Sequence, residues 1–182
     1  MAVYTKINKS NLKYINRKFN FENFQSFKGI KQGIENTNYL LRSKNKKFIL
    51  TIFEKRVLKK EIPFFMKLMD QLSNLNFNCP KPLKNYRGDY LIKVKNKTAC
   101  VVSFLDGKDK KKLNFKNCFD IGKTVAQMHL STKKLKLYRK NSMGIKNLNP
   151  LLNSIKFKSK KFINLEKLSL IHISEPTRRT TI

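Results

Sequence analysis

Apolar residues form two kinds of pattern along the chain, a helical spacing in some segments and short continuous runs in others. Three segments, residues 10–19, 61–75 and 117–131, show the three- and four-residue spacing of an amphipathic helix. Pro63 lies at the start of the second segment, where the first turn of a helix tolerates proline. The apolar residues at helical spacing are Leu12, Ile15 and Phe19; Ile62, Phe65, Met66, Met69 and Leu72; and Ile121, Val125 and Met128.

Shorter apolar runs bounded by polar turns predict strands. One lies at residues 24–30, and two more, 39–41 and 48–53, are joined by the polar stretch SKNKK, which predicts a hairpin. Residues 90–94 and 99–105 flank a KNK turn in the same way. The order is helix, three strands, helix, two strands, linker and helix. This order predicts an α+β lobe followed by the beginning of a helical lobe.

The charge balance invites a nucleic-acid interpretation. Lys and Arg number 41 against 11 Asp and Glu, which gives a net charge of +30. However, 34 of the cations are lysine and only 7 are arginine, with 20 asparagines alongside, which indicates compositional drift more than base and phosphate recognition. A basic nucleic-acid-binding module stays as an alternative, and it predicts binding with a steep inverse salt dependence. The lysine-rich residues 108–112 predict a solvated loop.

Cysteine usage and hydropathy favour a cytoplasmic protein. Cys79, Cys100 and Cys118 stand far apart, which fits neither a disulfide framework nor a zinc site. No apolar run approaches the ~20 residues of a membrane span. The start, MAVYTKINKS, has no apolar signal core.

Residues 33–39, GIENTNY, form the most suggestive polar turn. A glycine between two strands lets the backbone approach a phosphate, and consecutive N–H groups can form an anion-binding concavity. Asn36, Thr37 and Asn38 add neutral donors. An ordinary turn uses the same residue types, so both interpretations stay open.

Other residues are candidates for nucleotide binding if the lobe is built like that of a kinase. Asp70, on the second helix, could hold a basic group that grips nucleotide phosphates, or it could be an ordinary exposed acid. Thr51 and Lys55 share one face of their strand by the period of two. Residues 101–107, VVSFLDG, could connect two lobes and offer backbone groups to an adenine, or simply be a strand and its turn. His129 ends the third helix and is interpreted as structural.

The last 14 residues, SLIHISEPTRRTTI, differ in composition from the rest. They contain neither Lys nor Asn, and the string LIHISEPTR resembles the conceptual translation of a sequencing adapter. We therefore expect residues 169–182, His172 included, to be a non-native tail that interrupts the natural chain.

In this order, the pieces resemble the homoserine kinases of the aminoglycoside phosphotransferase/choline kinase superfamily. The matching stretches are MAVYTKI, FKGIKQGIENTNYLL, KFILTIFEKRV, EIPFFMKLMDQL, NCPKP, VVSFLDG, IGKTVAQMHL and NSMGI, over residues 1 to about 150. The resemblance implies a protein-kinase-like fold, with an N-lobe of about five antiparallel strands and one long helix before a helical C-lobe. It also implies phosphorylation of the hydroxyl of L-homoserine by Mg²⁺-ATP, a step in threonine biosynthesis.

The resemblance also assigns residues to a nucleotide site. The phosphate loop becomes Gly33, Asn36, Thr37 and Asn38. The helix acid becomes Asp70, and the hinge beside adenine becomes Ser103, Phe104, Leu105 and Asp106. Many relatives carry a basic residue where Thr51 stands, so Lys55 is our substitute for the cation that grips phosphate.

The pattern of the family is incomplete in this chain. The catalytic loop, H-x-D-L-x-x-x-N, and the later metal-binding Asp are absent from the sequence. Phosphoryl transfer needs a base for the substrate proton and carboxylates for Mg²⁺, so we expect this chain to be inactive, with the metal ligands outside it. Another small-molecule kinase of the superfamily, of choline or aminoglycoside type, is the alternative within enzymes.

The expected organisation has three parts. Residues 1–105 form the nucleotide-binding N-lobe, residues 106–168 form the hinge and an incomplete helical C-lobe, and residues 169–182 form the tail. The helix at 117–131 is expected to expose an apolar face, which predicts aggregation or a molten second part.

Overall fold

The structure is a computed structural model, and it describes residues 3–22, 24–54, 57–107, 110, 112–141, 144 and 150. The chain divides into two units, Met1–Leu137 and Tyr138–Ile182, and nearly all described residues belong to the first unit. Lys55, most of the lysine-rich stretch at 108–112 and the expected tail at 169–182 lie outside the described residues. The expected division at residues 105 and 106 stays a prediction.

The predicted order of elements is confirmed. The helices are α1 (Lys9–Phe19), α2 (Ile62–Asn74) and α3 (Phe115–Thr132); the strands are β1 (Phe24–Gly29), β2 (Thr37–Ser43), β3 (Lys47–Ile52), β4 (Leu91–Val94) and β5 (Lys97–Ser103). Their bounds agree with the apolar patterns to within a few residues. In the described part of the chain, no helix is both long enough and apolar enough to cross a membrane.

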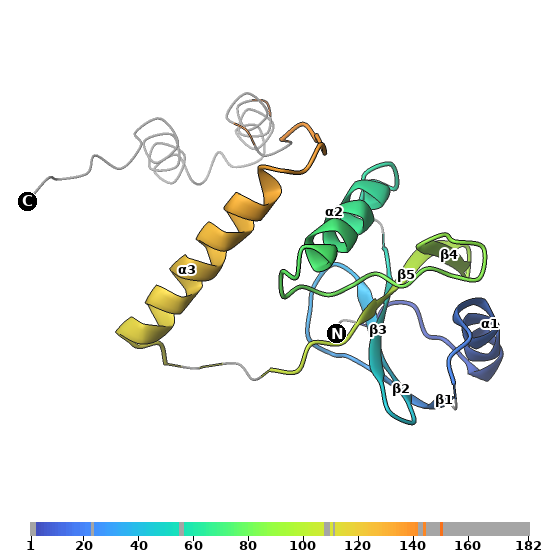
Figure 1. The fold of residues 1–182 in the computed structure, drawn as a ribbon. Helices are drawn as coiled ribbons and strands as arrows, with labels where there is room; N and C mark the ends of the chain where they lie inside the picture. Colours follow the sequence, from blue (N-terminus) through green and yellow to red (C-terminus); the bar gives the residue numbers. More distant parts are fainter. Residues whose placement is uncertain are drawn as a thin grey trace, which may run out of the picture. The chain divides into compact units, whose positions relative to one another are not determined.

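The five strands form one antiparallel sheet in the order β1-β2-β3-β5-β4 (Figure 1). The β2–β3 hairpin lies beside β5, and Thr51 of β3 pairs with Asn38 of β2 on one side and with Cys100 of β5 on the other. Lys95 and Asn96, both with positive φ, form the tight turn between β4 and β5. Strands distant in sequence are thus brought together around β3.

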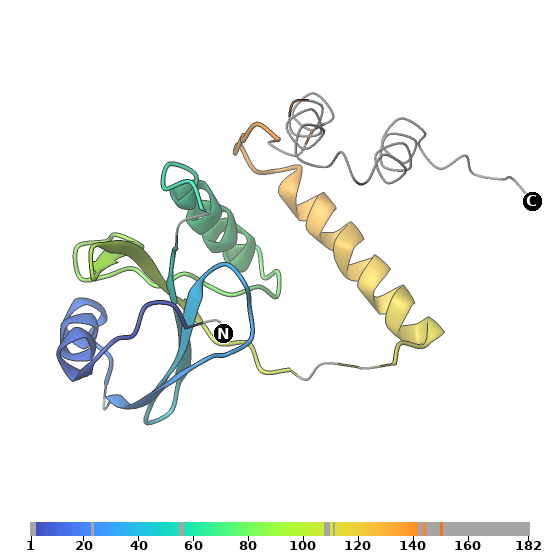
Figure 2. The ribbon, with the colours of Figure 1, turned by 180° about the vertical axis from the view of Figure 1, so that it is seen from behind.

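The two faces of the sheet carry separate clusters of buried apolar side chains. Ala99 and Val101 of β5 face the cluster that contains Leu12 and Ile15 of α1. The alternating Cys100 and Val102 belong to the second cluster, which contains Ile62 and Met66 of α2. Because successive side chains of a strand point to opposite faces, α1 and α2 cover opposite faces of the sheet (Figures 1 and 2).

Asparagines begin two of the helices. Asn8 and Asn11 form a capping box at the start of α1, and Asn114 and Asn117 repeat it at the start of α3. The helices differ in packing, because α1 buries Leu12 and Ile15 whereas α3 has no buried side chain. The expected exposure of apolar residues on α3 is confirmed; they are Phe115, Phe119, Ile121, Val125 and Leu130.

Candidate functional site

The predicted phosphate loop falls partly on the connection from β1 to β2, residues 30–36, which we call the β1–β2 loop, and partly on Thr37 and Asn38, the first two residues of β2. Its base is closed by the Ile30 amide, which donates to the Asn38 carbonyl over 2.9 Å. Gly33 has φ of 113°, a conformation that residues with a side chain rarely adopt. Residues 31–35 are exposed. The loop thus offers exposed backbone at the end of a hairpin, as an anion-binding turn requires.

Asn36 and Asn38 use their side-chain oxygens inside the protein. The Glu54 amide donates to Asn36 Oδ1 over 3.3 Å, and the Thr51 hydroxyl donates to Asn38 Oδ1 over 2.8 Å. The NH₂ end of each amide is the group that could donate to phosphate. The structure therefore brings Asn38 and Thr51 together, and Thr51 acts there as a neutral partner of the loop.

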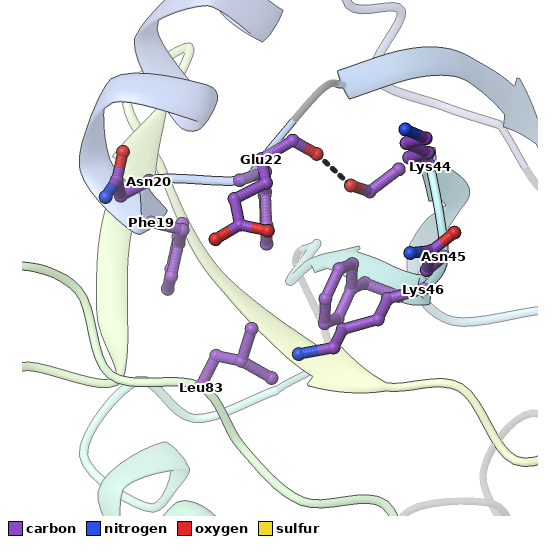
Figure 3. A pocket seen from close by; sticks show the side chains of 10 residues that line it. Phe19, Asn20, Glu22, Lys44, Asn45, Lys46 and Leu83 are labelled. Atoms are coloured by element: carbon purple, nitrogen blue, oxygen red, sulfur yellow. Dashed lines mark hydrogen bonds between the residues drawn. The ribbon is translucent and has the colours of Figure 1, made fainter.

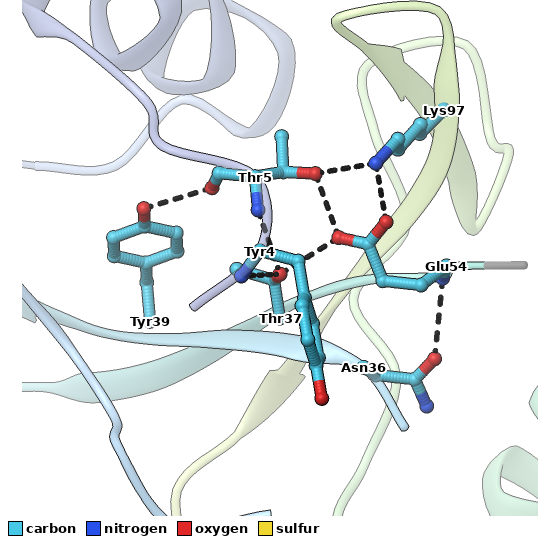
Figure 4. A network of polar contacts seen from close by, with 7 residues as sticks. All are labelled: Tyr4, Thr5, Asn36, Thr37, Tyr39, Glu54 and Lys97. Carbon is cyan, nitrogen blue, oxygen red and sulfur yellow. Dashed lines mark hydrogen bonds and ion pairs between the residues drawn. The ribbon is translucent and has the colours of Figure 1, made fainter. Parts of the chain in front are cut away.

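Thr37 is fully buried, and its hydroxyl is saturated. It accepts hydrogen bonds from the amides of Tyr4 and Thr5, each over 3.0 Å, and donates to Glu54 Oε1 over 2.7 Å (Figure 4). A hydroxyl has one proton and two lone pairs, so this side chain has no further capacity. A nucleotide contact from Thr37 would have to come from its backbone.

Glu54 is the centre of this polar network, two residues after the end of β3. Its Oε1 also accepts from the Thr5 hydroxyl over 2.6 Å, and its Oε2 forms an ion pair with Lys97 Nζ. Lys97 donates in addition to Thr5 Oγ1 over 2.7 Å. Glu54 thus joins the N-terminal segment, the end of the β1–β2 loop and the β4–β5 hairpin (Figure 4).

Two opposing effects act on the Glu54 carboxyl group. Burial raises its pKa, whereas hydrogen bonds from Lys97, Thr5 and Thr37, with the charge of Lys97, lower it. The lowering effects win, so the pKa lies below its ordinary value of 4.5. Glu54 is therefore a carboxylate near neutral pH and is committed to this network.

The predicted hinge begins at Ser103, the last residue of β5, which lies beside the start of β3. Ser103 pairs with Phe48, and the Phe104 amide extends the ladder by donating to the Lys47 carbonyl over 3.2 Å. Asp106 pairs with Lys47 over 3.0 Å at the surface. The Phe104 amide is thus committed to the sheet and is not a free donor for a base. Ser103 is three residues from Cys100, the partner of Thr51, or about 10 Å along the strand.

Asp70 lies in α2 and faces the tyrosine before β4. Its carboxylate accepts from Asn74 Nδ2 at the long distance of 3.5 Å. The pKa of Tyr90 is raised by burial and, next, by a hydrogen bond and the charge of Asp70. The described contacts of Asp70 are thus with Asn74 and Tyr90, which are not basic residues. Lys55 lies outside the described residues. The roles predicted for both residues stay predictions.

His129 lies in the last turn of α3. Its carbonyl accepts from the amide of Lys133 and from the hydroxyl of Thr132, and its residue is exposed. Backbone contacts of this kind are those of an ordinary helix end. They involve only the backbone of His129, so the structural interpretation of its side chain stays a prediction.

A cavity of about 410 Å³ lies away from the predicted site, between the end of α1 and the β2–β3 turn (Figure 3). Aromatic and basic side chains line it, among them Phe19, Phe21, Phe48, Lys44 and Lys46. Ser43 donates a hydrogen bond to the Glu22 carbonyl beside it. None of the predicted nucleotide residues lines this cavity.

The sequence predictions did not assign Glu54, Lys97 or Thr5. Glu54 and Lys97 are 43 residues apart, and one lysine among 34 gives no signal. The scarcity of acids was the available signal, because only 11 Asp and Glu are present and Glu54 lies two residues after an apolar strand.

A family model and curated proteins that match this chain are both phosphotransferases. Residues 26–153 match the family described as APH, the phosphotransferase enzyme family. The homoserine kinase of Parvibaculum lavamentivorans is 34% identical over 154 residues, which cover 85% of this chain and 48% of the relative. The homoserine kinase of Rhizobium etli strain CIAT 652 is 38% identical over 145 residues, 80% of this chain and 45% of the relative. The chain thus spans about half the length of the curated relatives it matches.

Solved structures share the fold at low sequence identity. An amicoumacin kinase in complex with AMP-PNP, Ca²⁺ and Ami matches with a TM-score of 0.58 and 18% identity, over 74% of this chain and 42% of that one. The spectinomycin phosphotransferase APH(9)-Ia, in complex with ADP and spectinomycin, matches with a TM-score of 0.60 and 13% identity, over 85% and 48%. The predicted protein-kinase-like α+β fold is confirmed. Because the family match covers most of the chain and agrees with this fold, the chain belongs to the phosphotransferase enzyme family.

Proposed function

We propose that the chain is the nucleotide-binding part of a homoserine kinase, an enzyme that transfers the γ-phosphate of ATP to the hydroxyl of L-homoserine in threonine biosynthesis. The observation that carries this proposal is the similarity to curated homoserine kinases, at 34% to 38% identity over most of the chain. The substrate, ATP and a cytoplasmic location come from this proposal.

In this function, the β1–β2 loop faces the phosphates and the segment after β5 faces the base. The exposed loop with its positive-φ glycine supports the first role. The separation of about 10 Å between the position of Thr51 and the end of β5 supports the second, since an extended nucleotide spans a comparable length. Asp70 and Lys55 stay candidates for holding the phosphate-gripping charge.

The described residues do not fit a complete Mg²⁺ site. No three His, Cys, Asp or Glu among them lie close enough together to hold a metal ion, and Glu54 is committed to Lys97. The sequence also has no H-x-D-L-x-x-x-N loop to supply a base. We therefore propose that the 182-residue chain binds ATP without phosphorylating homoserine.

Isothermal titration of the purified chain with ATP, and a coupled assay of homoserine-dependent ADP production, test this proposal together. Saturable ATP binding without turnover is the expected result. Absence of ATP binding would overturn the nucleotide-binding role, and turnover would overturn the inactivity. A sequencing read across the codon for Leu168 tests the expected tail, and the product of an uninterrupted locus can then be assayed with homoserine, choline and aminoglycosides.

A further inference from the structure

The N-terminal segment, residues 3–5, contacts the β1–β2 loop at Ile34 and contacts Thr37, the residue of β2 that directly follows the loop. The Tyr4 hydroxyl donates to the Ile34 carbonyl over 2.8 Å, next to Gly33. Directly after the loop, the amides of Tyr4 and Thr5 both donate to the Thr37 hydroxyl at the start of β2. The segment also packs closely on the start of the loop, because a Cβ added at Gly29 would lie 3.0 Å from Val3 Cγ2.

Glu54 links the N-terminal segment to the residues at the end of the loop through hydrogen bonds. Its Oε1 accepts from the hydroxyls of Thr5 and Thr37, so one oxygen joins the segment to the loop end (Figure 4). Its amide donates to Asn36 Oδ1, which adds the preceding residue of the loop. Lys97 then fixes the carboxylate itself through Oε2. None of these groups has to touch a nucleotide to determine where the loop backbone lies.

We propose that Glu54 is a positioning residue for the nucleotide, which holds residues 3–5 against the β1–β2 loop and keeps the loop in its binding conformation. The effect on nucleotide rests on the function proposed above, whereas the effect on the loop does not. The N-terminal segment is then a strap across the loop, and ATP affinity depends on a carboxylate outside the phosphate contacts.

Electrostatics and loop positioning predict opposite effects of Glu54→Gln on ATP binding. Glu54→Gln removes one negative charge, which by itself would strengthen the binding of anionic ATP. The amide cannot accept the same set of donors as a carboxylate, so the proposal requires weaker binding despite the added positive charge. We expect the Kd for ATP to rise about tenfold, within the usual range for coupled sites.

Two measurements on the full 182-residue chain test the proposal. The first is the Kd for ATP by titration calorimetry, well below the melting temperature of each variant. The second is amide hydrogen exchange by NMR without nucleotide, in which exchange in the β1–β2 loop should accelerate about tenfold in Glu54→Gln while the centre of β3 is unchanged. Lys97→Arg, which keeps the ion pair, should retain wild-type values in both.

Matched controls separate positioning from general destabilisation. Glu22→Gln removes an exposed carboxylate away from the loop, and Ile15→Val lowers stability through α1. Both should leave the Kd and the exchange of the loop unchanged. Tyr4→Phe is the second variant, for use if Glu54→Gln does not fold. It removes only the hydroxyl that donates to the Ile34 carbonyl, and Tyr4 is 56% exposed, so the fold should tolerate the change. This variant alone should accelerate exchange in the loop.

The outcomes are distinguishable. Unchanged loop exchange in both Glu54→Gln and Tyr4→Phe overturns the proposal, as does a Kd that falls with the added charge. If the wild-type chain binds no ATP, the proposed function fails, and the exchange measurement still decides whether Glu54 holds the loop.

Discussion

At Glu54, burial and hydrogen bonding act on one carboxyl group in opposite directions, and the hydrogen bonds prevail. Its folded pKa is lowered from the ordinary value of 4.5, so the folded state binds its proton less readily than the unfolded chain does. A group with a lowered folded pKa stabilises the protein above its unfolded value, and this contribution disappears as the pH falls through the folded value. Acid should therefore weaken the network first.

Glu54→Gln should lower the free energy of unfolding at pH 7 by about 1–2 kcal/mol, because Lys97 is partly exposed and water screens the pair. The loss relative to wild type should shrink as the pH falls from 4.5, where the unfolded chain takes up the proton, through the lower pKa of the folded wild-type carboxyl group. Urea unfolding at several pH values measures this difference. Glu22→Gln is the control, and parallel pH profiles for wild type and Glu54→Gln would contradict the prediction.

The three thiols differ in burial and so in reactivity. Burial raises the pKa of the Cys100 thiol to about 12, and it also raises the pKa of Cys79, whereas Cys118 is exposed. Since the thiolate is the reactive form, Cys100 should react with Ellman's reagent at pH 8 about a thousandfold more slowly than an ordinary thiol. Stopped-flow absorbance measures the phases. Cys118→Ser should remove the fastest phase, and loss of the slowest phase instead would contradict this assignment.

At the scale of elements, the two asparagine capping boxes provide a matched pair of sites. Asn8→Ala should lower the free energy of unfolding by about 1 kcal/mol, because α1 is packed on the sheet through Leu12 and Ile15. Asn114→Ala should leave it unchanged and only fray α3, which buries no side chain. Urea unfolding and circular dichroism separate the two effects. Equal losses in both variants would show that α3 is coupled energetically to the sheet.

The elements were predictable because each is recorded in local apolar spacing. The helix at 61–75 follows from its three- to four-residue apolar spacing, and the hairpin at 39–53 follows from two short apolar runs joined by a polar turn. The polar network was not predictable in the same way, because Thr5, Glu54 and Lys97 belong to three separate segments that meet only in the folded sheet. Thr5, Thr37 and Glu54 lie in the stretches that resemble the family, but the resemblance implies no role for Thr5 or Glu54.

At the scale of the whole molecule, a high positive charge and an exposed apolar helix act against each other. The net charge of +30 makes copies of the chain repel one another. The apolar side chains of α3 favour association, with Phe115 87% exposed and Phe119 63% exposed. Salt screens charge repulsion and leaves the apolar attraction in place, so added salt should promote self-association of this protein.

Light scattering measures this balance from low ionic strength to about 1 M salt, where the Debye length is about 3 Å. The double variant Phe115→Ser and Phe119→Ser should suppress the salt-induced rise without lowering the stability of the sheet, because neither side chain is buried. Lys116→Ser with Lys123→Ser changes the same helix but removes charge, so it should move the onset to lower salt. These opposite shifts identify α3 as the surface of association. If neither double variant moves the onset, another surface drives association, and the apolar residues of α3 are then not its cause.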